Sequence, residues 1–269
     1  MNKILLIGCG HMGSALLQSW YKNSKNIFSI IDPIQHKKIK KIYSKRVKTF
    51  KNINEIKNTK TFDIIILAVK PQVIEGVLKD FKFLHFKKNI LFMSIIAGKK
   101  ISFFKKFLPT AIQFVRAMPN MPASINRGMT CLVSHRSLSK KNKIRATDLF
   151  EMVGKIVWLK NENDIDKITA VSGSGPAYYF LFIDLFQKAA FEIGLSKDVS
   201  KKLVEQTALG SIELLFKNKK NAEQLTNMIA IKGGTTEAAI RSFKKNNLLK
   251  KTIKNAVNSA FRRSKELGK

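Results

Sequence analysis

Residues 3–13 of this 269-residue chain read KILLIGCGHMG, a short apolar run that passes directly into a GxGxxG motif. The run predicts a buried strand, and the apolar spacing after the motif predicts a helix that includes Ser14–Tyr21. A strand, a glycine turn and a helix in this order are typical of a dinucleotide-binding fingerprint. Gly8 would permit the tight turn, Gly10 would let a pyrophosphate approach the backbone, and Gly13 would let helix and strand pack closely. The stretch therefore predicts a βαβ unit that binds a dinucleotide at its first turn.

An acidic residue follows the second predicted strand, where such folds bind the ribose of the cofactor. Asp32 lies 19 residues beyond Gly13, and a carboxylate at this spacing holds the ribose hydroxyls. It favours NAD because it repels the 2′-phosphate of NADP. His36, Lys37 and Lys38 follow closely, however, and could receive that phosphate. The sequence leaves NADP and NAD both open, and a glycine turn that binds no ligand is the simpler alternative.

Short β-branched runs alternate with helix-like segments from residue 3 to about residue 159. This alternation predicts βαβ units, a mostly parallel sheet and helices on both of its faces. The apolar run Ile64–Leu67 fits a strand that is buried on both faces. The predicted strands are Lys3–Ile7, Ile27–Ile31, Val47–Phe50, Asp63–Val69, Ile90–Ile95, Ile112–Arg116, Met129–Ser134 and Lys155–Leu159.

A polar run at residues 160–164 marks a change, because only helical spacing persists beyond it. A segment that is almost entirely amphipathic helices has little room for its own core, so we expect it to pack against a second copy of itself. The predicted fold is α/β: a doubly wound, mostly parallel Rossmann sheet over residues 1–160, then an all-α dimerisation and substrate-binding domain over residues 161–269. The predicted helices are Ile165–Ile193, with a break or restart at Ser172–Pro176, then Lys197–Phe216, Ala222–Ile231, Thr235–Lys245 and Leu248–Leu267.

Three later segments indicate ligand contacts. Ala68–Gln72 ends a buried strand, at the sheet edge where open α/β sheets bind ligands. Met118–Pro122 is too rich in proline to form a core element. Residues 232–240 read KGGTTEAAI and place two glycines and two threonines at the start of a helix. Successive free amides, an N-cap hydroxyl and the helix dipole predict a site for a small carboxylate there.

With these motifs the chain resembles the pyrroline-5-carboxylate reductases over essentially its full length. The resemblance implies that a hydride passes from reduced NADP or NAD to C5 of the cyclic imine 1-pyrroline-5-carboxylate, which gives L-proline in the last step of its biosynthesis. The segments that carry it are GCGHMG at 8–13, AVKPQ at 68–72, SIIAG at 94–98, RAMPNMPA at 116–123, SGSGPAYYFLFID at 172–184, QTALGS at 206–211 and GGTT at 233–236.

The resemblance also implies roles for individual residues. The substrate carboxylate would bind the backbone amides of Gly234 and Thr235, and Thr236 would be the catalytic residue, with its hydroxyl on the ring nitrogen. Little acid–base chemistry is needed, because a protonated imine is already electrophilic and positioning contributes most of the acceleration. An asparagine after the third strand, Asn52 or Asn54, would join the cofactor site. With Asp32 included, the expected cofactor-binding residues are Gly8, Cys9, Gly10, His11, Met12, Gly13, Asp32, Ala68, Val69, Lys70, Pro71, Ile95, Ile96 and Ala97, and the substrate-binding residues are Asn120, Gly233, Gly234, Thr235 and Thr236.

Two positions depart from the family's pattern. His11 stands where the fingerprint often has asparagine, at a position that mainly offers its backbone. Ile231 and Lys232 stand where Ser-Pro commonly precedes the two glycines, so a serine contact to the substrate carboxylate would be missing. Lys232 either replaces that contact with its charge or points to water.

The chain is strongly basic, with 50 Lys and Arg against 18 Asp and Glu and a formal net charge of +32. Such a charge raises a second hypothesis, a nucleotide-sensing regulator that binds nucleic acid. Only eight of the basic residues are arginine and the lysines are spread over the whole chain, so we expect no nucleic-acid partner. The rival among enzymes is a β-hydroxyacid or 6-phosphogluconate-type dehydrogenase. These need a lysine on the first long helix after the linker, and residues 168–187 contain none.

Other classes are excluded by composition. The four histidines and two cysteines lack metal-ligand spacing, so we expect no metal site. No apolar run approaches the roughly 20 residues of a membrane span, so we expect no membrane partner. Cys9 and Cys131 cannot form a disulfide framework and favour a reducing, cytoplasmic location. The resemblance further implies a homo-oligomer in which the helices of one subunit complete the site of the other.

Overall fold

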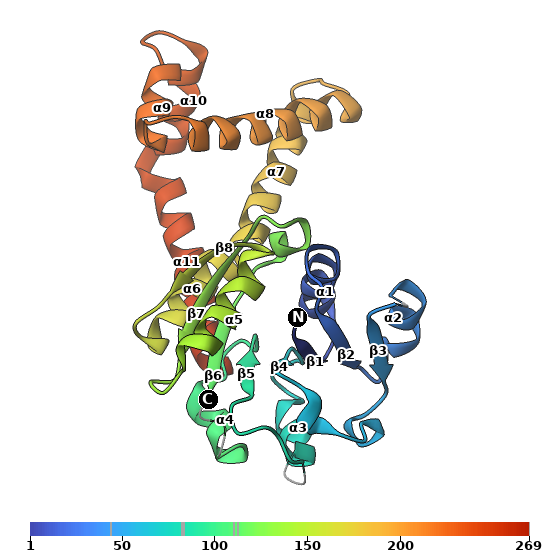
Figure 1. Cartoon of the computed structure of the whole chain (residues 1–269). Coiled ribbons are helices and arrows are strands. Elements are labelled where there is room, and N and C mark those ends of the chain that lie inside the picture. The colour runs from blue at the N-terminus through green and yellow to red at the C-terminus, as the bar shows by residue number, and fades with distance from the viewer. Residues whose placement is uncertain (44, 82–83, 110, 112, 269) are drawn as a thin grey trace. The chain divides into compact units, whose positions relative to one another are not determined.

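The computed structural model describes residues 1–43, 45–81, 84–109, 111 and 113–268 (Figure 1). An eight-stranded sheet runs in the order β3-β2-β1-β4-β5-β6-β7-β8, and its neighbouring strands are parallel except for the antiparallel pair β6 and β7. The first six strands therefore have the doubly wound Rossmann order, which places the topological switch point between β1 and β4. The strands are β1 Lys3–Ile7, β2 Ile27–Ile31, β3 Val47–Phe50, β4 Ile64–Leu67, β5 Leu91–Ser94, β6 Phe114–Met118, β7 Gly128–Ser134 and β8 Gly154–Trp158.

The predicted fold class is confirmed, and each predicted strand overlaps one of these eight. The first three match residue for residue, whereas the predicted strand Asp63–Val69 is longer than β4 because the chain leaves the sheet after Leu67. The predicted strand Ile112–Arg116 starts at a residue that lies outside the described ones, and β6 runs two residues further than expected, to Met118.

Helices cover both faces of the sheet. One face packs against α1 (His11–Asn23), α2 (His36–Ile42) and α5 (Lys140–Glu151), and the other against α3 (Ile74–Asp80) and α4 (Ile101–Phe107). Strands β4 and β5 are therefore buried on both sides, which explains why they read as almost continuous apolar runs rather than as alternating ones.

Helix α1 is stabilised at its carboxyl end and left open at its amino end. Leu16, Leu17 and Trp20 are buried in the core of its sheet face. At the carboxyl end of the helix, Arg46 donates hydrogen bonds to the carbonyl oxygens of Tyr21 and Ser24 and stacks over the Tyr21 ring. A cation there complements the negative end of the helix dipole. The N-cap is Gly10, which has no side chain to cap the helix, and the first turn carries no acidic residue.

The chain divides into two compact units, Met1–Ser174 with the C-terminal residues from Ala260 onward, and Gly175–Ser259. The first unit contains the whole sheet, helix α6 (Ile165–Ile168) and a single π-helical turn over Thr169–Gly173. It also holds the end of α11, where the Ser264 hydroxyl donates to Oδ1 of Asp166 at 2.8 Å. The predicted domain boundary at residues 160/161 stays a prediction.

The second unit is helical throughout its regular structure. The prediction that the C-terminal half is helical is confirmed. The predicted break at the SGSGP segment is the π turn, in which the Ser174 amide donates to the Thr169 carbonyl at 2.8 Å. Helix α9 begins with a reciprocal capping box between Asn221 and Gln224. The helices are α7 Gly175–Glu192, α8 Lys197–Lys217, α9 Ala222–Ile229, α10 Thr235–Lys244 and α11 Leu248–Leu267, whose last turns belong to the first unit.

Candidate active site

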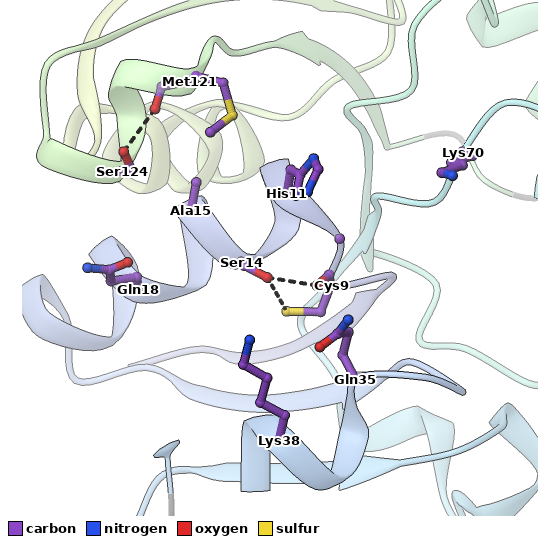
Figure 2. Close-up of a pocket in the computed structure, with 11 residues that line it drawn as sticks. Cys9, His11, Ser14, Ala15, Gln18, Gln35, Lys38, Lys70, Met121 and Ser124 are labelled. Carbon is purple, nitrogen blue, oxygen red and sulfur yellow. Dashed lines mark hydrogen bonds between the residues drawn. The ribbon is translucent and has the colours of Figure 1, made fainter. Parts of the chain in front are cut away.

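A cavity of about 580 Å³ opens at the carboxyl end of β1, beside the switch point of the sheet (Figure 2). The glycine turn is held at this edge because the Gly8 amide donates to the Ile31 carbonyl at 2.9 Å and the Ala68 amide donates to the Ile7 carbonyl at 2.8 Å. The crevice outside the carboxyl ends of the strands, at such a switch point, is where open α/β sheets bind ligands. The cavity is lined by Cys9, Gly10, His11, Ser14, Ala15, Gln18, Gln35, Lys38, Lys70, Met121 and Ser124.

The three glycines of the motif are required for different reasons. Gly8 has a φ of +91°, and a Cβ there would lie 2.7 Å from the Ala68 carbonyl oxygen. A Cβ on Gly13 would lie 2.6 Å from the carbonyl oxygen of Gly8. Gly10 differs from both, because a Cβ on it would meet no heavy atom within 4 Å. The fold itself therefore demands the first and third glycines, whereas the open space over Gly10 faces the cavity and fits a ligand that approaches the backbone.

The amino end of α1 supplies hydrogen-bond donors to this cavity. The first amides of a helix have no partner within the helix, and the positive end of the dipole favours an anion there. The Ser14 hydroxyl donates to the Cys9 carbonyl at 2.7 Å, which fixes the turn that precedes these amides. Lys38 and Lys70 add positive charge to the cavity lining. This set of donors fits a pyrophosphate.

Asp32 is buried, and its carboxylate is occupied by backbone amides. Oδ2 accepts from the Cys9 amide at 2.7 Å, and Oδ1 accepts from the amides of Ile34 and Gln35 at 2.9 and 2.7 Å. The carboxylate thus connects the glycine turn to the turn after β2. Figure 2 shows that the side chains of Gln35 and Lys38, which follow Asp32 in the chain, reach toward the glycine turn.

Two polar residues of α1, Ser14 and Gln18, line the cavity although sequence reasoning missed them. Together with the expected His11 and with Ala15 they follow the spacing i, i+3, i+4 and i+7 on α1, and all four line the cavity (Figure 2). Helical periodicity of polar residues directly after the motif was the available signal. Gln35 offered no comparable signal.

Of the expected residues at the ends of β4 and β5, only Lys70 lines the cavity. Ile95 and Ile96 are buried and can offer only their backbone to a ligand. The Ile95 amide continues the sheet by donating to the Leu67 carbonyl at 3.0 Å, and the Ile96 amide donates to the Ser94 hydroxyl at 3.2 Å. These contacts fix the start of the segment that contains Ile95, Ile96 and Ala97.

Asn120 is buried, and both ends of its side-chain amide are engaged. Nδ2 donates to the Ser172 carbonyl and hydroxyl oxygens at 3.1 and 3.3 Å, and Oδ1 accepts from the Met129 amide at 2.9 Å. Asn120 therefore joins the end of β6 to the start of β7 and to the π turn. Its expected contact with a substrate stays a prediction.

The GGTT segment lies in the second unit, at the amino end of α10. Gly233 has a φ of +78°, and its amide donates to Oε2 of Glu237 at 2.8 Å. The Gly234 amide donates to the Ile231 carbonyl at 3.0 Å. Thr235 and Thr236 are the first two residues of α10, so their amides have no partner within the helix. The Gly234 amide thus already has a partner, whereas the amides of Thr235 and Thr236 are open donors at this helix start. The expected binding of the substrate carboxylate by the amides of Gly234 and Thr235 stays a prediction.

Cys9 lines the cavity, and the pKa of its thiol is raised. Burial raises its pKa to about 11, the hydrogen bond with Ser14 lowers it, and the nearby Asp32 carboxylate raises it further. Burial also raises the pKa of Cys131. Both cysteines are free thiols.

We expect native Cys9 to react with iodoacetamide at pH 8 about 100-fold more slowly than the same cysteine in the urea-unfolded chain. The thiolate is the reactive form, and a pKa raised by about two units removes most of it. Because the folded-state pKa lies above the unfolded one, the native rate should keep rising about tenfold per pH unit until the pH reaches about 11, whereas the unfolded rate should level off about two units lower. Mass spectrometry of the alkylated peptides measures both rates, and equal rates would show that the thiol is not shielded.

Two further classes of site find no support in the described part of the chain. No group of three or more His, Cys, Asp or Glu side chains lies close enough to hold a metal ion among the described residues. Within those same ranges, no helix has the length and apolar character to cross a membrane.

Comparison with known proteins identifies the family. Residues 162–267 match the model of the pyrroline-5-carboxylate reductase dimerisation domain, and residues 3–98 match that of the coenzyme F420-dependent NADP oxidoreductases. The pyrroline-5-carboxylate reductase of Pasteurella multocida is 33% identical over 273 residues, which cover 100% of this chain and 98% of that protein. That of Pseudomonas aeruginosa is 36% identical over 205 residues, covering 76% and 74%.

Solved structures agree with these relatives. The crystal structure of Plasmodium falciparum pyrroline carboxylate reductase with NADP bound superimposes with a TM-score of 0.87 at 31% identity, covering 100% of this chain and 98% of that one. The Coxiella burnetii pyrroline-5-carboxylate reductase gives 0.87 at 33% identity, covering 100% and 99%. The fingerprint, the GGTT segment and the full-length likeness lead to one conclusion: this chain belongs to the pyrroline-5-carboxylate reductase family.

Proposed function

We propose that this chain reduces 1-pyrroline-5-carboxylate to L-proline with NADPH or NADH. The observation that carries the proposal is that a chain matching these reductases over its whole length keeps both an open glycine turn at Gly10 and a helix amino end at GGTT. Reduced nicotinamide, when bound, supplies the hydride. A new C–H bond forms at C5, the π electrons of the C=N bond move to nitrogen, and the oxidised cofactor leaves.

The residues of the chain contribute binding and orientation. The α1 amides and the cations of the cavity hold the pyrophosphate, and the amides of Thr235 and Thr236 hold the substrate carboxylate. The Thr236 hydroxyl accepts a hydrogen bond from the protonated ring nitrogen, which fixes the ring and stabilises the electrophilic form of the imine. Positioning of this kind removes much of the entropic barrier to hydride transfer.

The direct test is to mix the purified chain with NADPH and 1-pyrroline-5-carboxylate. The proposal expects loss of nicotinamide absorbance and formation of an equal amount of L-proline, together with the reverse oxidation of proline at high pH. Turnover of a β-hydroxyacid instead would support the rival dehydrogenase. Salt-sensitive retention on DNA without reductase activity would support the regulator.

The cofactor preference we propose is NADPH over NADH. Asp32 does not oppose it, because three backbone amides donate to this carboxylate and offset the negative charge that would repel a 2′-phosphate. Lys38 supports it, because its side chain lines the cavity close to the turn after β2, where the 2′-phosphate binds in this fold.

In the Lys38→Met variant, kcat/KM for NADPH divided by kcat/KM for NADH should fall about tenfold. The reason is the loss of one charge-assisted contact with the 2′-phosphate, worth about 1.4 kcal/mol. Lys40→Met is the matched control, since residue 40 lies two positions further on α2 and does not line the cavity. Steady-state kinetics with both cofactors measures the ratio, and an unchanged ratio in Lys38→Met would remove this residue from cofactor selection.

A homodimer through the helical half completes the proposal. Within α7 only Gly175 and Ala190 are buried, while Tyr179, Phe180 and Phe182 are 64%, 66% and 51% exposed. So large an exposed apolar surface is typical of an interface. We therefore keep residues 161–269 as the dimerisation and substrate-binding domain.

The cytoplasmic location also remains a proposal, which the two free cysteines favour.

A further inference from the structure

A buried ion pair outside the cavity connects three segments of the first unit. Arg116 lies in β6, opposite Ser94 of β5, and only 1% of its side chain is exposed. Its Nη1 atom lies 3.2 Å from Oε1 of Glu162, which is 23% exposed. The other terminal nitrogen, Nη2, is buried and has no hydrogen-bond partner among the described residues.

Glu162 also caps a helix that is distant in sequence. Its Oε1 atom accepts from the amide of Ile101, the first residue of α4, at 2.8 Å. The N-cap of α4, Lys100, offers no capping side chain, and the first turn has no acidic residue. The Glu162 carboxylate therefore supplies both the missing cap and the negative charge that a helix amino end favours. Next to it, Lys100 Nζ lies 3.1 Å from Oδ1 of Asn163.

These contacts fix the far end of the segment that carries Ile95, Ile96 and Ala97. The segment begins at the end of β5, where the Ile95 and Ile96 amides are hydrogen-bonded, and it ends at Ile101. Between the two ends, Gly98 has a φ of +78° and lies so close to Leu267 of α11 that a Cβ would be 2.6 Å from its carbonyl carbon. The segment is therefore held at both ends and covered in the middle.

Stability alone does not explain a buried arginine at this place. Replacing a buried ion pair by apolar side chains of similar volume is often neutral or stabilising, and a buried donor without a partner opposes folding. A pair that is retained in spite of both costs fits a role in fixing geometry.

We propose that Arg116 and Glu162 are positioning residues that hold the backbone of residues 95–97 against the bound dinucleotide. The inference rests on the proposed function, because it takes these residues to contact the cofactor. Arg116 fixes the Glu162 carboxylate, Glu162 fixes the start of α4, and α4 fixes the end of the 95–100 segment.

The test compares Arg116→Met and Arg116→Lys with the control Arg145→Met. Arg145 forms an ion pair at 3.7 Å with Asp63, the residue that precedes β4. This pair lies at the amino end of β4, whereas the cavity lies at the carboxyl ends of the strands. We expect Arg116→Met to raise the Kd for NADPH about tenfold and to lower kcat by a further tenfold, because small misplacements near reacting groups cost up to two orders of magnitude. Arg116→Lys should lie between Arg116→Met and the wild type, and Arg145→Met should bind NADPH like the wild type.

A double variant separates positioning from stability. Arg116→Met with Glu162→Leu leaves no unpaired buried charge, so its thermal midpoint should return toward that of the wild type while the Kd for NADPH stays raised. Recovery of both the midpoint and the Kd would show a merely structural pair and overturn the inference. Wild-type-like binding by Arg116→Met would overturn it as well. A wild-type chain that binds no NADPH would instead overturn the proposed function together with the inference.

Discussion

The Gly10→Ala variant is expected to bind NADPH about 100-fold more weakly than the wild-type chain while it unfolds at nearly the same temperature. An alanine is compatible with the backbone there, since Gly10 has a φ of −67° and a Cβ would meet no protein atom within 4 Å. The methyl group would instead occupy the space through which the pyrophosphate approaches the α1 amides. Losing about two charge-assisted hydrogen bonds corresponds to roughly 2.8 kcal/mol, which is a factor of about 100.

Two other glycines serve as controls for this result. Gly13→Ala should lower both affinity and thermal stability, because its Cβ would lie 2.6 Å from the Gly8 carbonyl oxygen and the turn would have to shift. Gly76→Ala, in α3, should leave affinity unchanged, since a Cβ there meets nothing within 4 Å and alanine favours a helix. Fluorescence titration with NADPH and thermal melts give both quantities. If Gly10→Ala bound NADPH like the wild type, the pyrophosphate could not lie over this turn.

The sheet could be predicted because its strands carry a local signal. Ile64–Leu67 and Leu91–Ser94 are buried on both faces, so each must be almost wholly apolar, and glycine or polar residues end each run. The helical half could be predicted for the same reason, because its apolar residues recur at helical spacing. The doubly wound fold class followed from the fingerprint, which is typical of a Rossmann βαβ unit.

The use of individual polar side chains could not be predicted. Spacing alone placed Asp32 correctly at the end of β2, but it did not show that the carboxylate accepts hydrogen bonds from three backbone amides. Asn120 bonds to Ser172, 52 residues further along the chain, and Arg116 pairs with Glu162 across 46 residues. Such pairs depend on how distant segments pack, and no local pattern of residues encodes that packing.

The expected substrate site could also be predicted only in part. The two threonines at a helix start were visible in the sequence, and the open amides of Thr235 and Thr236 follow from that position. The sequence did not reveal that Glu237 turns back to accept from the Gly233 amide and pairs with Arg241 at 3.5 Å. This carboxylate lies next to the expected anion site, so an anion bound there would lie beside a negative charge.

The Thr236→Ala variant is expected to lower kcat at least tenfold with little change in the Kd for NADPH. The hydroxyl contacts the nitrogen whose C=N double bond becomes a single bond in the reaction, so its loss should appear in the chemical step. The backbone amide of residue 236 remains for the substrate carboxylate, so KM should change less than kcat. Alanine also favours a helix more than threonine does, so α10 should stay intact.

Two further variants distinguish the hydroxyl from the methyl group of Thr236. Thr236→Ser keeps the hydroxyl and should retain most of the turnover, whereas Thr236→Val keeps the shape and should resemble Thr236→Ala. Thr226→Ala is the control for removing a threonine hydroxyl from the same unit, because that hydroxyl donates to the Ala222 carbonyl at 2.8 Å within α9. Wild-type turnover by Thr236→Val would exclude the hydroxyl from the reaction. Positioning by the amides of Thr235 and Thr236 would then have to account for the whole contribution of α10 to the rate.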